Sequence, residues 1–147
     1  MRRACEVGVA NDGLTDRAAQ ETGLSEADVR SQVAALCILG GTHRDGALER
    51  VSAAANAYKH GTLDDKRHPI TSDGDILAVG AGFGVDGFGI GKFSGVEVML
   101  MLKDGKQRKF LGDVPYSIAG WLSFLKGNGA SLPNPPVVVC GRDASPP

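Results

Sequence analysis

The sequence predicts an α+β fold, in which a helical first part is followed by a small antiparallel sheet and a final helix. Residues 1–60 are rich in alanine, contain no proline and place apolar side chains at the three- and four-residue spacing of helices. Residues 96–102 carry valine or leucine at every second position, which is the period of a strand. An apolar stripe over residues 114–126 returns to helical spacing. This order of elements is typical of an α+β domain.

Three helices are expected in the first part, over residues 15–22, 25–38 and 46–60. Ser25 precedes an apolar helical stripe and belongs to the residue types that cap helix N-termini. The pair Gly40-Gly41 is expected to end that helix, and Asp45 to cap the next one. Gly61 is expected to close the third helix.

The second part is expected to form strands over residues 76–79, 96–102 and 107–111, followed by a helix over residues 114–126. Between the last two strands stands Asp104-Gly105, a pair that tolerates the positive φ angles of hairpin turns. Asp113 is expected to cap the final helix, with Pro115 near its first turn.

The composition changes near residue 61, because every proline and most glycines follow it. We expect residues 1–60 to form a helical subdomain, and residues 61–132 to form a β-hairpin and helix packed in the same domain. Residues 133–147 form a proline-rich tail. Within this tail, residues 137–139 are expected to add an edge strand, and the last few residues to be loosely held.

The overall composition is that of a globular protein of about one domain. The chain has 147 residues, of which 42% are hydrophobic and 22% charged. Sixteen lysines and arginines oppose 17 acidic residues, so the net charge of −1 argues against a protein that coats nucleic acid through bulk electrostatics. The unusual feature is 21 glycines, about twice the average frequency.

We expect a cytoplasmic protein that does not enter a membrane. No run of about 20 apolar residues is present, and the N-terminus lacks the apolar core of a signal peptide. The cysteines, Cys5, Cys37 and Cys140, are widely spaced and form no C-x-x-C pair, which excludes a zinc ribbon. A reduced, intracellular chain is the simplest interpretation.

One string carries a family resemblance. Residues 55–61, Ala-Asn-Ala-Tyr-Lys-His-Gly, resemble the signature of HEPN domains, which are small helical bundles of prokaryotic toxin–antitoxin and phage-defence systems. Catalytic members carry Arg-Asn-x-x-x-His, and the arginine and histidine cleave RNA without metal at a dimer interface. Asn56 and His60 match this pattern, whereas Ala55 stands in the position of the arginine.

The resemblance implies a bacterial or phage origin, a homodimer, and a role in defence, counter-defence or toxin–antitoxin regulation. It also implies His60 and Asn56 as the residues of a metal-independent ribonuclease, although alanine offers no cation to the scissile phosphate. Arg50 lies almost three helical turns away, roughly 15 Å, and cannot replace the missing arginine in one subunit. The alternative is an ordinary helix C-terminus, where Lys59 and His60 suit the helix dipole.

Residues 15–37 also resemble a helix-turn-helix, with Ala19, Gly23 and Val29 at the favoured small, turn and apolar positions. The second helix would then lie in the major groove of DNA. The residues that it offers to bases and phosphates are Arg30, Ser31 and Gln32. The acidic residues at its start would repel phosphate, and two ordinary packed helices are the alternative interpretation.

Residues 80–92 form a glycine-rich run that contains Phe83, Phe88 and Lys92. It includes G-x-G-x-x-G, but a strand rather than a helix is expected to follow, which argues against a dinucleotide site. No cofactor is therefore expected. The run is interpreted as a twisted loop pinned by its rings, as a backbone phosphate cradle with Lys92, or, with the rings exposed, as a partner-binding surface.

A basic cluster surrounds the predicted hairpin turn and consists of Lys103, Lys106, Arg108 and Lys109. Such a cluster is suited to an acidic partner or a nucleic-acid backbone, and a solvated turn is the alternative. His43, His60 and His68, with Asp64 and Asp65, show no helical ligand spacing, so no metal site is predicted.

No complete catalytic set can be assembled from the sequence, which favours a protein other than an enzyme. The preferred hypothesis is a non-catalytic binding or regulatory protein that acts through protein–protein contacts, with the basic cluster and the glycine-rich run as its surfaces. The alternatives are a DNA-binding regulator that uses residues 15–37 and a ribonuclease that uses His60.

Overall fold

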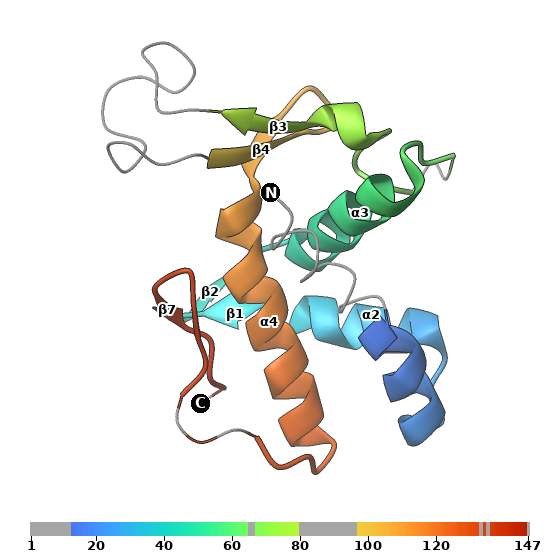
Figure 1. Ribbon diagram of the computed structural model, residues 1–147. Coiled ribbons are helices and arrows are strands. Elements are labelled where there is room, and N and C mark those ends of the chain that lie inside the picture. Colours follow the sequence, from blue (N-terminus) through green and yellow to red (C-terminus); the bar gives the residue numbers. More distant parts are fainter. Residues whose placement is uncertain (1–12, 65–66, 80–96, 133, 135, 147) are drawn as a thin grey trace.

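The computed structural model describes residues 13–64, 67–79, 97–132, 134 and 136–146. It confirms the α+β prediction: helices gather around one long helix, α4, and antiparallel strands form small separate sheets (Figure 1). The helices are a helix over residues 13–22, α2 (Glu26–Ala35), α3 (Ala47–His60), η1 (Asp73–Asp75) and α4 (Phe110–Gly127). The strands are β1 (Ile38–Leu39), β2 (Thr42–His43), β3 (Ile76–Val79), β4 (Glu97–Met101), β5 (Gln107–Lys109), β6 (Val138–Val139) and β7 (Arg142–Asp143).

Two of the predicted helix boundaries depend on caps that the structure contains. The Ser25 hydroxyl accepts a hydrogen bond from the Asp28 backbone N–H at 3.1 Å, which confirms the N-cap of α2. Gly61, with φ of +75°, ends α3 as predicted. The predicted cap at Asp45 is wrong, because Gly46 is the N-cap of α3 and makes no side-chain cap bond.

The prediction of a helix as far as residue 38 is also wrong at its end. α2 stops at Ala35, and β1 pairs with β2 in a short antiparallel hairpin. Gly40 and Gly41 have φ of +56° and +75°, the two left-handed residues that a two-residue hairpin turn requires. The glycine pair therefore turns a hairpin instead of ending a helix.

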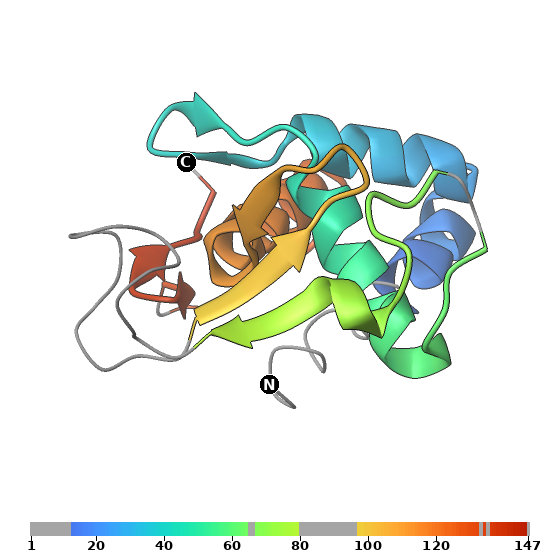
Figure 2. The same cartoon turned by 90° about the horizontal axis from the view of Figure 1, so that it is seen from above.

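The main sheet has the strand order β3-β4-β5, and both pairings are antiparallel. Ile76 and Arg108 lie opposite Leu100 on either side. The face that carries Val98 and Leu100 packs into a core with α3 and the first turns of α4. Figure 2 shows this sheet in front of α4, which is seen along its axis.

α4 begins four residues earlier than predicted and follows β5 without a loop. Lys109 is its N-cap residue, so the strand predicted to residue 111 ends at residue 109. Phe110 is buried in the core, and this burial stabilises a helix that begins at residue 110. Asp113 is therefore inside the helix and does not cap it, and Pro115 is an internal residue.

α4 joins two hydrophobic clusters. Its first half packs with α3 and the main sheet through Phe110 and Val114. Its second half packs with α2, the helix over residues 13–22 and the start of α3 through Tyr116, Trp121 and Phe124. The rings of Trp121 and Phe124 meet edge to face, with centroids 6.0 Å apart.

The C-terminal segment packs against α4 as far as residue 144. The strand expected at residues 137–139 is present as β6, which pairs with β7. Val139 packs against the first cluster, and Ala144 is completely buried. Buried apolar side chains fix this segment through residue 144.

Candidate binding surface of the β4–β5 hairpin

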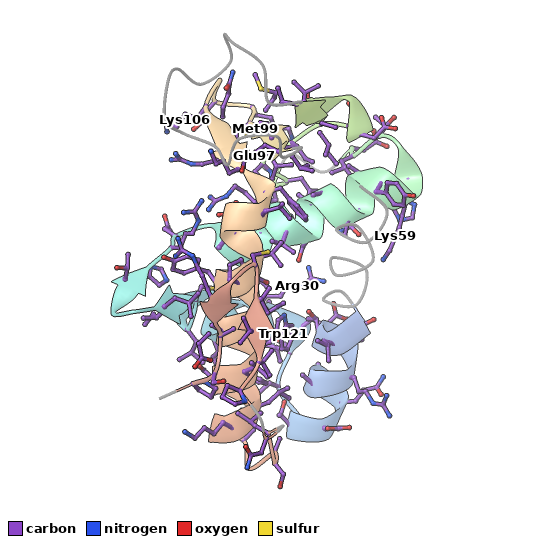
Figure 3. The ribbon with its side chains drawn as sticks, turned by 60° about the vertical axis from the view of Figure 1, so that its left-hand side comes forward. Arg30, Lys59, Glu97, Met99, Lys106 and Trp121 are labelled. Carbon is purple, nitrogen blue, oxygen red and sulfur yellow. The ribbon has the colours of Figure 1, made fainter. Side chains whose placement is uncertain are left out.

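The four predicted basic residues lie together on the hairpin that β4 and β5 form. Lys103, Lys106 and Arg108 are exposed, and Lys109 is half-buried at the point where β5 enters α4. Figure 3 shows Lys106 at this end of the molecule, close to Glu97, and Lys59 on the opposite flank. The local turn therefore places the cluster as the sequence predicted.

The tip of the hairpin is a tight, charged turn. The Asp104 carboxylate accepts hydrogen bonds from the Lys106 ammonium at 2.8 Å and the Lys106 backbone N–H at 3.0 Å. These bonds lower the pKa of Asp104, so the carboxylate remains ionised. Gly105, with φ of +79°, closes the turn as the predicted Asp-Gly pair requires.

The base of the hairpin contains a second ion pair. The Lys109 ammonium lies 3.0 Å from a Glu97 carboxylate oxygen, and both side chains are about two-thirds buried. Four cations thus face two carboxylates over residues 97–109, which leaves the hairpin with two positive charges in excess. The chain as a whole has a net charge of −1, so the net charge of this surface is opposite in sign to that of the whole molecule.

Contacts at both ends hold the hairpin to the domain. At its tip, the Lys103 backbone N–H donates to the Pro69 carbonyl at 2.9 Å. At its base, β5 continues directly into α4, so the hairpin follows the orientation of that helix. The basic surface is therefore presented by a fixed element.

The first turn of α4 is fixed by a buried ion cluster that the sequence did not reveal. Asp113 is completely buried and accepts hydrogen bonds from Arg50 Nε at 2.8 Å, Arg50 Nη2 at 3.0 Å and Arg44 Nε. Arg50 Nη2 also donates to the Asp45 carbonyl at 2.8 Å. A buried carboxylate requires such partners, and here they come from α3 and from the loop between β2 and α3.

The residues of the HEPN-like string lie on α3. Asn56 is half-buried, and His60 is exposed in the last turn beside Gly61. Ala55, in the position of the catalytic arginine, is 1% exposed. Arg50 is held by Asp113, as described above, so the structure brings no arginine of this helix to His60.

The helix-turn-helix residues also fall on adjacent helices. Gly23, with φ of +73°, connects the helix over residues 13–22 to α2, and Val29 is buried between the helices. The predicted DNA-contacting residues, Arg30, Ser31 and Gln32, are all exposed. Arg30 lies 3.7 Å from Glu26, and with Asp28 the outer face of α2 has one negative charge in excess.

The glycine-rich run cannot be placed on the structure. Phe83, Phe88 and Lys92 lie outside the described residues. Among the described residues, no group of three or more His, Cys, Asp or Glu side chains is placed to hold a metal ion, and no helix is long and apolar enough to cross a membrane.

Cys37 is buried, and desolvation raises the pKa of its thiol to about 12. A thiol with so high a pKa carries almost no thiolate at neutral pH, which fits a core residue. The Cys37 thiol donates to the Val33 carbonyl at 3.4 Å, a contact within the helical cluster.

No protein-family model, curated protein or solved structure matches the chain.

Proposed function

We propose that this protein is a non-catalytic binding module that docks onto an acidic surface of a partner protein through the β4–β5 hairpin. The observation that carries the proposal is the local excess of two positive charges on an exposed, firmly anchored hairpin of an otherwise slightly acidic chain. Such a patch steers an acidic partner and sets its orientation.

A protein partner suits this surface better than nucleic acid. Proteins that bind DNA tightly make roughly 6–10 phosphate contacts, whereas Lys103, Lys106, Arg108 and Lys109 provide four cations, two of them facing carboxylates. The outer face of α2, where a DNA-binding helix would be, has an excess of negative charge. These two features favour acidic side chains over a phosphate backbone.

The non-catalytic part of the proposal is supported by α3. Cleavage in the HEPN manner needs an arginine near His60, but Ala55 is a buried methyl group and Arg50 is bound to Asp113. His60 then stands as the dipole-complementing residue of a helix C-terminus.

A charge-reversal pair of variants tests the proposal. Lys106→Glu with Arg108→Glu reverses the hairpin, and Arg17→Glu with Arg30→Glu makes the same charge change on exposed residues of the first two helices. Each is immobilised and exposed to nuclease-treated lysate of the source organism, and captured proteins are identified by mass spectrometry. We expect the hairpin variant to lose a partner that the wild type and the control variant retain.

Salt and nuclease separate the outcomes. Capture of the partner should weaken as salt rises from 0.15 M toward 1 M, since the screening length falls from about 8 Å to 3 Å. Equal capture by the two double variants would refute the role of the hairpin. Capture from an untreated lysate that is absent with the nuclease-treated lysate would show that nucleic acid is the ligand.

A further inference from the structure

The two short hairpins, β1–β2 and β6–β7, have the same construction. Each turns through two left-handed residues, Gly40-Gly41 in the first and Cys140-Gly141 in the second. Each is closed by a backbone hydrogen bond, from Arg44 to Cys37 at 3.0 Å and from Ala144 to Val137 at 2.8 Å. Figures 1 and 2 place both hairpins on the flank of α4 that faces away from α3.

An arginine from each hairpin reaches the same aromatic ring on α4. The Cζ atom of Arg44 lies 5.5 Å from the ring centroid of Tyr116, and that of Arg142 lies 5.9 Å from it. Nη1 of Arg142 also lies 3.4 Å from the Tyr116 hydroxyl oxygen. Tyr116 is only 7% exposed, so both guanidinium groups lie against a largely buried ring.

Arg44 is held by one ion pair, and its side chain is only partly buried. Its Nε donates to the buried Asp113, while a third of its side chain remains exposed. Among the described residues, the two terminal nitrogens of Arg44 take part in no hydrogen bond. The donors that remain on Arg44 and on the exposed Arg142 are therefore available to a ligand.

The charges near the ring balance, with Arg44, Arg50 and Arg142 against Asp45, Asp113 and Asp143, so an anion would be held by guanidinium donors and not by an excess of positive charge. Asp113 neutralises one of the three arginines Arg44, Arg50 and Arg142. The Asp143 carboxylate is engaged by the Ser145 backbone N–H at 2.9 Å, in the turn that follows β7. Asp45 is exposed next to Arg44, and its backbone carbonyl, rather than its carboxylate, binds Arg50.

We propose that Arg44 and Arg142 form a binding site for a phosphate-type dianion, either free phosphate or the phosphate group of a modified side chain in a partner protein. Two guanidinium forks match the charge and the oxygen geometry of a dianion. Asp113 and Tyr116 restrict both side chains before binding, which reduces the entropy lost on association. Arg44 lies beside the base of the β4–β5 hairpin, because a Cβ atom at Gly112 would be 3.1 Å from Arg44 Nη2 and 3.6 Å from Lys109 Cβ, but this proposal does not depend on the function of the hairpin.

The test is a titration of ¹⁵N-labelled protein with inorganic phosphate at constant ionic strength and pH 7.5, followed through backbone and arginine Nε–H signals. We expect saturable shifts at Arg44, Arg142 and Tyr116. Arg142→Gln should weaken phosphate binding by about tenfold or more, because hydrogen bonds from a charged donor are lost. Arg142 makes no contact with Asp113, so this variant keeps the buried ion cluster intact.

Matched variants make the result specific. Arg17→Gln removes the same charge from an exposed position on the first helix and should leave phosphate affinity unchanged. Arg44→Lys keeps the charge but loses the fork, so weaker binding is expected. Asp143→Asn removes a neighbouring negative charge and should tighten binding. Equal affinity of the Arg142→Gln and Arg17→Gln variants would overturn the proposal, as would identical shifts with chloride in place of phosphate.

Two further arms identify the source of the dianion. A phosphoserine peptide that binds more tightly than free phosphate, while its unphosphorylated form does not bind, supports a modified partner protein. Equal affinity of the phosphopeptide and inorganic phosphate supports free phosphate as the ligand. The Lys106→Glu and Arg108→Glu variant should retain phosphate binding, which separates this site from the hairpin surface.

Discussion

Asp113 connects three parts of the chain at a single buried carboxylate. It lies in the first turn of α4. Its partners Arg44 and Arg50 stand 69 and 63 residues earlier in the sequence, so all three strands of the main sheet come between them and Asp113. A buried charge that loses its partner costs far more than the pair itself contributes, because the remaining group has no water to solvate it. The effect of substitution is therefore expected to be large at this position.

Asp113→Asn should lower the free energy of unfolding by about 3–5 kcal/mol, because Arg50 would keep its charge in a buried environment. Urea unfolding followed by tryptophan fluorescence measures the change. Asp16→Asn, on an exposed site of the first helix, is the control and should change stability by no more than about 0.5 kcal/mol. A loss below about 1 kcal/mol for Asp113→Asn would contradict the role assigned to the ion cluster.

The error at Asp113 has a local cause. An aspartate that stands just before a valine and a proline has the sequence signature of an N-cap, and only packing decides otherwise. The burial of Phe110 extends the helix backwards, and the two arginines then engage the carboxylate inside it. Neither partner is close in sequence, so no local pattern could have identified the cluster.

At the scale of elements, Gly120 allows α2 and α4 to pack closely. A Cβ atom at this position would lie 2.7 Å from the Val33 carbonyl oxygen and 3.0 Å from the Cys37 sulfur. The first of these contacts is with backbone, which cannot rotate away as a side chain can. Gly127, near the end of the same helix, has no atom within 4 Å of the equivalent position.

These two glycines form a matched pair for substitution. Gly120→Ala should destabilise the protein by about 1–3 kcal/mol through overpacking at the helix crossing. Gly127→Ala should be neutral or stabilise it by up to about 1 kcal/mol, because alanine is the better helix former. Thermal unfolding monitored by circular dichroism compares them, and the same sign for both variants would show that the crossing is loose.

Some elements were predictable from sequence, whereas the β1–β2 hairpin was not. α3 and β3 match their predicted ranges to within a residue, because a helical apolar stripe that ends at Gly61 marks the first and a short apolar run marks the second. The β1–β2 hairpin has two residues in each strand, too few to show a period. Its Gly40-Gly41 turn is equally suited to a helix end, so tertiary pairing alone decides between them.

For the molecule as a whole, the C-terminal segment acts as part of the core. Ending the chain after Leu132 would remove Val139 from the first cluster, the completely buried Ala144, and the contact of Arg142 with Tyr116. We expect the midpoint of thermal unfolding to fall by roughly 5 °C or more, from the loss of about 2 kcal/mol of apolar burial.

Differential scanning calorimetry measures this shift. Val138→Thr is the matched control, because the Val138 side chain is 66% exposed and its loss should leave the midpoint unchanged. An unaltered midpoint in the truncated chain would mean that the segment is not part of the cooperative unit.

The two surfaces differ in how far the sequence reveals them. The basic residues of the β4–β5 hairpin are neighbours along the chain, so a local turn prediction was enough to group them. Arg44 and Arg142 are far apart in the sequence, and each lies against Tyr116. This arrangement depends on the packing of two separate hairpins against α4 and has no local signature.

Because β5 continues into α4 without a loop, the direction in which the hairpin points depends on the rotation of α4 about its own axis. Each residue of an α-helix turns the chain by about 100°, so one residue inserted between Lys109 and Phe110 would rotate one element against the other by more than a quarter turn. Asp113 and its arginines lock α4 in one rotational setting. The ion cluster therefore helps to fix the orientation of the basic surface relative to the rest of the domain, although it touches none of the exposed lysines.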